Sequence, residues 1–231
     1  MGVIMYSDTI LVPVSLFLMV GYHAYLWHSI KTRPSVTTIG SDALKRKSWF
    51  IALYAGDDKK AMLAIQSLRN TLMITILTAT IAVLVTLAVG ALTNNAFTAR
   101  DLFSSPFFGS TSPKITALKY GAASLFLVAS FLCSSLALGF LIDANYLINA
   151  SSPAGLGPDS SDGCPYSLTV FENGFVLAIF GNRLLCLTFP MLMWMFGPVP
   201  VVLSSSALVW VLYELDFTKT PSGITKHSPT D

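Results

Sequence analysis

Charged side chains are scarce in this sequence. Asp, Glu, Lys and Arg make up 11% of its 231 residues, whereas a soluble domain carries roughly 25%. Hydrophobic residues make up 53%, and the mean hydropathy is +0.65. So few charges do not cover a water-exposed surface of this size, which excludes a secreted or cytosolic enzyme and predicts a polytopic membrane protein.

A large excess of charge of either sign is also missing, and so is a cysteine framework. Fourteen Lys and Arg against twelve Asp and Glu leave a formal net charge of +2, too little for an electrostatic nucleic-acid binder. The three cysteines are an odd number, and two of them lie in apolar runs. Neither a disulfide framework nor a zinc site is predicted, and we expect no metal and no nucleic-acid partner.

Catalytic motifs are absent as well. The chain has no nucleotide-binding loop, nucleophile elbow, zinc-protease helix or pair of catalytic carboxylates. No segment gathers a nucleophile, a base and an orienting group. We therefore expect no enzymatic activity and no cofactor.

Four apolar runs are long enough to cross a bilayer, since a hydrocarbon core about 30 Å thick needs about 20 helical residues. These runs are residues 10–27, 71–92, 120–142 and 184–213. They predict an all-α fold in which residues 1–217 form a single four-span membrane domain, followed by a flexible polar tail at 218–231. The loops 28–70 and 143–183 then share one membrane face, and both termini share the other.

The fourth run is too long for a straight crossing. Its 30 residues would extend about 45 Å as a helix, and Gly197, Pro198 and Pro200 interrupt it. Each proline removes an amide donor, so carbonyls about one turn upstream lose their partners. We predict a kinked or re-entrant helix, in which the break is either structural or a cation site made of carbonyl groups.

Basic residues indicate the orientation, because Lys and Arg beside a span stay cytosolic. Eight of the fourteen lie in the loop 28–70, which gives nine positive residues on the face of the two long loops against five on the other. We therefore expect cytosolic loops and non-cytosolic termini. Asn149, in the sequence Asn149-Ala150-Ser151, should then carry no glycan.

The loop 28–70 is expected to contain helices. Residues 43–54 predict a short helix, and a second helix begins near Asp57 and meets no breaker before Gly90. This second helix should run from the cytosol straight through the second span. A basic cluster followed directly by aromatic residues predicts an anchor on anionic lipid headgroups. The cluster consists of Lys45, Arg46 and Lys47.

His23 is the one clear ionisable residue inside a predicted span. A charge buried in lipid costs several kcal/mol, so such a residue is a functional candidate by default. His23 either serves as a proton or ion site or is a neutral imidazole, hydrogen-bonded across helices or stacked on Trp27.

Four threonines of the second span fall on one helical stripe: Thr71, Thr75, Thr78 and Thr86. Their hydroxyl groups either line water around the axis of an oligomer or bond to their own i−4 carbonyls and pack against a neighbouring helix. Small residues in the third span predict close helix packing there.

Three carboxylates are expected at the mouths of the first and fourth spans, on one membrane face: Asp8, Glu214 and Asp216. A ring of such groups would concentrate cations, although solvated helix ends account for single acids equally well.

The pairs Arg69-Asn70 and Asn182-Arg183 stand at the start of the second and fourth spans. They indicate a weak internal repeat of two parallel halves.

Several local motifs are spread over nearly the whole chain and are specific in combination. They are Tyr22-His23 with Leu26-Trp27, the run from Leu63 to Thr71, Tyr146-Leu147-Ile148-Asn149, Gly181-Asn182-Arg183-Leu184, the run from Trp194 to Pro200, and Leu212-Tyr213 with Leu215-Asp216-Phe217. Together they resemble a plant membrane family known as the domain of unknown function number five hundred and ninety-nine. This resemblance implies a membrane fold and no particular activity.

In size and four-span plan the chain is also similar to the WeiTsing-type small plant endomembrane cation channels, which are associated with root immunity. That similarity implies a ring-shaped oligomer that passes cations, calcium among them, in the endoplasmic reticulum or the plasma membrane.

These features predict a homo-oligomeric, cation-permeable channel, because one four-span chain is too small to enclose a pore comfortably. Its expected partners are the lipid bilayer, anionic headgroups, cations and further copies of itself, with a pentamer as one expectation. Two alternatives stand beside it. One is a membrane anchor or scaffold that recruits a cytosolic partner through residues 41–68, and the other is a proton-coupled transporter that uses His23.

Overall fold

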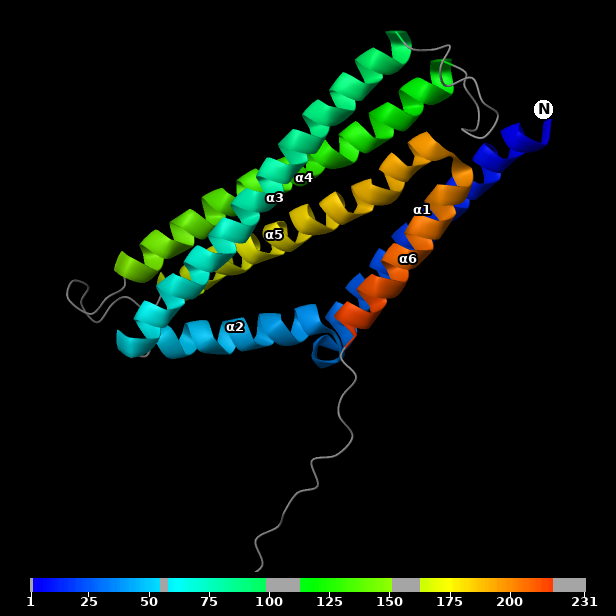
Figure 1. Ribbon diagram of the computed structural model, residues 1–231. Coiled ribbons are helices and arrows are strands. Elements are labelled where there is room, and N and C mark those ends of the chain that lie inside the picture. The colour runs from blue at the N-terminus through cyan, green and yellow to red at the C-terminus, as the bar shows by residue number, and fades with distance from the viewer. Residues whose placement is uncertain (1, 55–57, 99–112, 151–162, 218–231) are drawn as a thin grey trace, which may run out of the picture.

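The computed structural model describes residues 2–54, 58–98, 113–150 and 163–217, which are almost entirely helical (Figure 1). The predicted all-α class is confirmed, and the predicted tail 218–231 lies outside the described residues. In chain order the elements are α1 (Gly2–Thr32), the 3-10 helix η1 (Pro34–Val36), α2 (Thr38–Tyr54), α3 (Asp58–Thr98), α4 (Pro113–Ala150), α5 (Gly163–Met193), the 3-10 helix η4 (Trp194–Phe196) and α6 (Pro198–Asp216).

The described helices include five, not four, that are long and apolar enough to cross a membrane. Their candidate spans are Ile10–Thr32, Met62–Asn94, Ile115–Asn149, Pro165–Phe196 and Pro198–Asp216. The prediction of four spans was therefore wrong at its last member. Most of the expected loop 143–183 is helical too, since α4 continues to Ala150 and α5 begins at Gly163.

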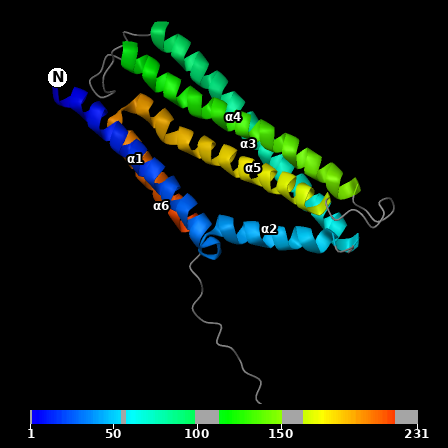
Figure 2. The same cartoon turned by 180° about the vertical axis from the view of Figure 1, so that it is seen from behind.

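The extra span arises because the chain reverses at Gly197 instead of kinking there. Gly197 has φ 131° and ψ 175°, a conformation that is essentially reserved for glycine. Its N–H donates to Trp194 O at 3.2 Å, closing η4. Pro198 then starts α6, where a missing amide donor costs nothing, and α6 runs back beside α1 (Figures 1 and 2).

The prediction of one long helix through the second span agrees with α3. It begins at Asp58 and continues for 41 residues to Thr98, which corresponds to about 60 Å. The candidate span in α3 begins at Met62. The described part of the chain therefore contains one rod that is about twice as long as the hydrocarbon core is thick.

The helices form two groups. The helices α3, α4 and α5 lie side by side in one group, and α1 and α6 lie side by side in the other (Figures 1 and 2). The helix α2 crosses beneath both groups, from the end of α1 to the start of α3. The turn at Gly197 and the helix α2 thus connect the two groups at opposite ends of the molecule.

Small residues allow α4 and α5 to make the most extensive helix contact in the described structure. Ser130 Oγ of α4 donates to the carbonyl oxygen of Gly181 in α5 at 2.7 Å. A Cβ atom on Gly181 would lie 2.5 Å from Ser134 Oγ. The expected close packing of the third span is therefore observed at its serine face.

Helix α2 is held to the first group by aromatic packing. Phe50 is fully buried, and its ring centroid lies 4.9 Å from that of Phe171 in α5. The guanidinium carbon of Arg46 lies 4.6 Å from the ring centroid of Phe175, one turn further along α5. Burying a side chain such as Phe50 from water contributes about 1.5–3 kcal/mol, which is enough to fix α2 across the bundle end.

The turn at Gly197 can be tested by substitution. Replacing Gly197 with Ala should lower the stability of the protein by about 1–3 kcal/mol, because a Cβ atom strains this backbone conformation. Thermal unfolding of the purified protein in detergent measures the effect. The matched control is Gly139→Ala, since a Cβ at Gly139 meets nothing within 4 Å, and equal melting temperatures for the two variants would contradict the role of the turn.

Candidate functional site

A carboxylate, a guanidinium and a phenol from three helices meet inside the protein. Asp216, the last residue of α6, is only 2% exposed. Its carboxylate accepts a hydrogen bond from the hydroxyl of Tyr22 in α1 at 2.5 Å. It also forms an ion pair with Arg183 of α5. We name Tyr22, Arg183 and Asp216 the triad. All three belong to candidate spans, and such ionisable groups mark functional sites by default.

Packing between helices explains how Tyr22 and Arg183 reach the site. Tyr22 lies one turn from Leu26, and both pack against Leu212 of α6 in one buried cluster. This contact brings the phenol toward the end of α6. Arg183 follows Gly181, where α5 lies against α4, so its backbone is fixed within the first helix group.

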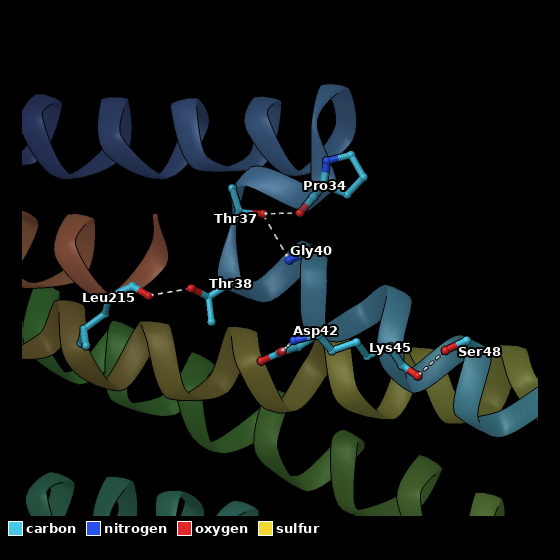
Figure 3. Close-up of polar contacts among 8 residues, drawn as sticks. All are labelled: Pro34, Thr37, Thr38, Gly40, Asp42, Lys45, Ser48 and Leu215. Carbon is cyan, nitrogen blue, oxygen red and sulfur yellow. Dashed lines mark hydrogen bonds and ion pairs between the residues drawn. The ribbon is translucent and has the colours of Figure 1, made fainter. Parts of the chain in front are cut away.

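The corner between α1 and α2 holds the end of α6 in place (Figure 3). Thr38 Oγ1 donates to Leu215 O at 2.8 Å, and an antiparallel β-bridge joins Thr37 to Phe217. The corner itself depends on Gly40, whose N–H donates to Thr37 Oγ1 at 3.2 Å, so that the Thr37 side chain caps the start of α2. A Cβ on Gly40 would lie 2.4 Å from Pro34 O, so the corner excludes a larger residue there.

Two nitrogen atoms at the site are buried without a hydrogen-bond partner among the described residues: Arg183 Nη1 and His23 Nε2. His23 Nδ1 lies 2.8 Å from Met19 O, and because a carbonyl can only accept, Nδ1 carries the proton in this contact. The His23 ring meets the ring of Tyr22 edge to face, with centroids 5.2 Å apart. His23 thus bonds within its own helix through Nδ1, whereas Arg183 Nη1 has no hydrogen-bond acceptor among the described residues.

The predicted threonine stripe faces the interior of the single chain. Each of the four hydroxyl groups donates to the carbonyl four residues earlier, at distances from 2.7 to 3.2 Å. Thr75 and Thr78 are 3% and 6% exposed, and Thr71 and Thr86 are half-buried. This arrangement matches the packing alternative, and the lining of a pore by these threonines stays a prediction.

The three predicted mouth carboxylates do not share one environment. Asp216 is buried in the triad, whereas Glu214 is exposed at the end of α6. The helix α1 contains Asp8, whose side chain lies outside the described residues. Gly197, Pro198 and Pro200 form the reversal between α5 and α6, so the predicted break is a hairpin turn.

The basic cluster of α2 is divided between the protein and its surface. Lys45 and Lys47 are exposed, and Lys45 pairs with Asp42 at 3.6 Å. Arg46 is half-buried over Phe175, and burial lowers the pKa of its guanidinium from the usual value. The headgroup anchor therefore stays a prediction for the two lysines.

The two Arg/Asn pairs predicted at span starts have different surroundings. Arg69 and Asn70 are exposed on α3, as is Asn182 on α5. Arg183 alone turns inward, with 16% of its side chain exposed.

Sequence reasoning did not predict Tyr22 as a site residue. The signal available was its position next to His23 in the apolar first span.

A cavity of about 620 Å³ opens beside the triad, where α1, η1 and α6 end. We name it the corner cavity. Its lining residues are Tyr25, His28, Ser29, Thr32, Arg33, Val36, Tyr213, Glu214 and Phe217. In the part of the chain that the structure describes, no group of three or more His, Cys, Asp or Glu residues could hold a metal ion.

Removal of one triad partner should destabilise the protein. Arg183→Ala leaves a buried, uncompensated carboxylate, which costs about 3–5 kcal/mol, or a decrease in melting temperature on the order of 10 °C. The control Asp42→Ala breaks an exposed pair that contributes about 0–1 kcal/mol. Thermal unfolding in detergent compares the two variants, and a similar small shift in both would show that Asp216 needs no cationic partner.

Comparison with known proteins assigns the sequence to a family. Residues 10–221 match the family described as "Protein of unknown function, DUF599", a range that includes all three triad residues. No curated protein and no solved structure matches the chain. Because the match covers most of the sequence, the resemblance implied by the local motifs is confirmed, and the chain belongs to the DUF599 family.

Proposed function

We propose that this protein transports a small ionic solute across a membrane, with Arg183, Asp216 and Tyr22 as its intramembrane site. The observation that carries this proposal is the burial of a full ion pair, Arg183 with Asp216, between helices of predominantly apolar sequence. Such a pair is a weak source of stability, because well-packed apolar residues of the same volume often stabilise a protein as much or more. In spans, paired charges mark solute, ion or proton pathways.

The unbonded atoms at the site support the same role. Arg183 Nη1 is buried without a partner among the described residues, and an unsatisfied buried donor costs about 1–3 kcal/mol. An anionic oxygen at this nitrogen would remove that cost. His23, the residue proposed from the sequence for a proton-coupled transporter, lies beside this site, since its ring meets that of Tyr22 edge to face.

The triad joins the two helix groups, so a change in its contacts could accompany movement of one group against the other. Arg183 belongs to the group of α3, α4 and α5, whereas Asp216 and Tyr22 belong to the pair of α1 and α6. Separation of Asp216 from Arg183 would release one polar link between the two groups. Motion of one helix group against another is how many secondary transporters alternate access.

Proteoliposomes containing the full chain test this proposal. Solid-supported membrane recordings would follow charge movement after concentration jumps of protons, potassium, calcium, chloride and succinate. Asp216→Asn keeps the shape of the side chain but removes its charge, so transport should fall at least about tenfold. The control is Asp143→Asn, which changes an exposed carboxylate of α4 and should leave transport unchanged.

A variant with exchanged charges separates transport from folding. Arg183→Asp combined with Asp216→Arg retains an ion pair between the same helices and should restore stability without restoring transport. Normal transport by folded Asp216→Asn, or the absence of charge movement with every solute of the set, would overturn the proposal.

A homo-oligomeric cation channel is the second candidate. It is supported by the small fraction of each candidate span, 22–28% of its most apolar window, that is buried within one chain. The remaining apolar surface is available to further copies as well as to lipid. Stepwise single-channel currents from a verified oligomer would favour the channel, whereas turnover-limited currents from a monomer would favour the transporter.

We propose an orientation in which α2 lies on the cytosolic face of the membrane. With five crossings, the start of α1 and the end of α6 lie on opposite faces (Figure 1). Eight of the fourteen basic residues lie between Lys31 and Arg69, on the face of α2, and two more follow α6 in the sequence. Lys114 and Lys119 lie at the start of α4, on the other face, and Arg100 precedes them in the sequence. The positive-inside rule therefore favours an external N-terminus and a cytosolic C-terminus.

Glycosylation tags provide the test of this orientation. A tag fused to the N-terminus should be glycosylated in microsomes, a tag fused to the C-terminus should not, and Asn149 should stay unmodified because it lies on the face of α2. Endoglycosidase treatment confirms that a mass shift is a glycan. Modification of both tags, as the four-span prediction required, would show that one of the five helices does not cross.

A further inference from the structure

The corner cavity presents groups of both charges. Arg33 and His28 contribute a guanidinium and an imidazole, and Glu214 contributes a carboxylate. Ser29 and Thr32 add hydroxyl groups to the same wall. A cavity lined in this way is complementary to a ligand that itself carries an anionic and a cationic group. A ligand with charge of only one sign would meet a wall group of the same sign, which is unfavourable.

Aromatic side chains form another part of the lining. The ring of Phe217 lies between those of Tyr25 and Tyr213, with centroids 5.6 and 4.8 Å away. An aromatic wall accepts apolar groups, and its π-electrons attract an alkylated ammonium group. The cavity therefore combines a phosphate-type anion site at Arg33 with a surface suited to a quaternary or primary ammonium group.

The surroundings place this cavity at the edge of a bilayer. It lies at the end of the candidate span that finishes at Thr32. Close by, Lys31 Nζ is positioned 5.3 Å from the ring centroid of Trp27, which is 45% exposed. A tryptophan paired with a lysine at a helix end is typical of the membrane–water interface, where phospholipid headgroups are the most abundant small molecules.

Contacts next to the cavity hold its walls together in the protein alone. The bridge between Thr37 and Phe217 and the hydrogen bond from Thr38 to Leu215 join its two walls (Figure 3). Gly40 allows the tight corner that carries Arg33 and Val36. A preformed cavity of about 620 Å³ is within the size range of small-molecule sites.

We propose that the corner cavity binds the headgroup of a zwitterionic phospholipid, with the phosphate at Arg33 and His28 and the ammonium group at Glu214 and the aromatic wall. The glycerol and the first acyl carbons then lie along Tyr25 toward the bilayer. This inference does not rest on the transport role, since none of the triad residues lines the cavity.

Native mass spectrometry of the full chain in maltoside detergent tests the binding. The probes are dioleoyl phosphatidylcholine, which carries both charges, and dioleoyl phosphatidylglycerol, which carries only the phosphate. The wild-type protein should retain phosphatidylcholine roughly tenfold more strongly, a ratio expected for one charge-assisted contact. Equal retention of the two lipids would overturn the proposal.

Three variants assign the contacts. Arg33→Ala should lower retention of both lipids roughly tenfold, whereas Glu214→Gln should remove the preference for phosphatidylcholine. Lys47→Ala is the matched control, because Lys47 is exposed on α2 and does not line the cavity. Equal retention by Arg33→Ala and Lys47→Ala would contradict the proposed phosphate contact, and gel filtration verifies that each variant is folded.

Free phosphocholine distinguishes a lipid from a soluble source of the same headgroup. If the ligand is a lipid, equimolar phosphocholine should leave the bound phosphatidylcholine in place, because phosphocholine lacks the glycerol and acyl carbons that lie along Tyr25. Displacement at equal concentration would assign the cavity to a soluble phosphate ester and overturn the lipid proposal.

Discussion

The carboxylate of Asp216 imposes the strictest constraint on this structure. It has lost almost all contact with water, so it requires a cation and hydrogen-bond donors from its surroundings. Arg183 supplies the cation from one helix group and Tyr22 a donor from the other. The end of α6 must therefore stop where both can reach it, and this explains why the corner at Thr37 and Thr38 fixes α6 at its last residues.

Hydropathy predicted the first three spans and the long helix through the second, because apolar length is a local property of the sequence. Hydropathy did not predict the separate span formed by α5 between residues 163 and 197, for two reasons. Glu172, Asn182 and Arg183 interrupt the apolar pattern of α5, and a Gly-Pro break does not indicate whether a helix bends or reverses. Only the backbone dihedrals of Gly197 decide between these outcomes, and they depend on the packing of α6 against α1.

The candidate site was predicted less completely than the fold, because its contacts join residues far apart in the sequence. Asp216 and Arg183 both appeared among the predicted residues, but in separate roles, because a pair 33 positions apart in two helices has no sequence signature. Tyr22 is 194 positions from its partner. The threonines of α3 illustrate the reverse case, since their hydroxyl groups follow the local i−4 rule and the packing alternative could be stated without a structure.

The length of α3 has a mechanical consequence. A continuous helix of 41 residues is a stiff rod of about 60 Å, and its first turn, which precedes the candidate span at Met62, lies next to α2. A change of one degree in its tilt displaces the far end by about 1 Å relative to the near end. A rotation of α3 at its contact with α2 would therefore be carried along the whole rod and appear as a displacement of its other end.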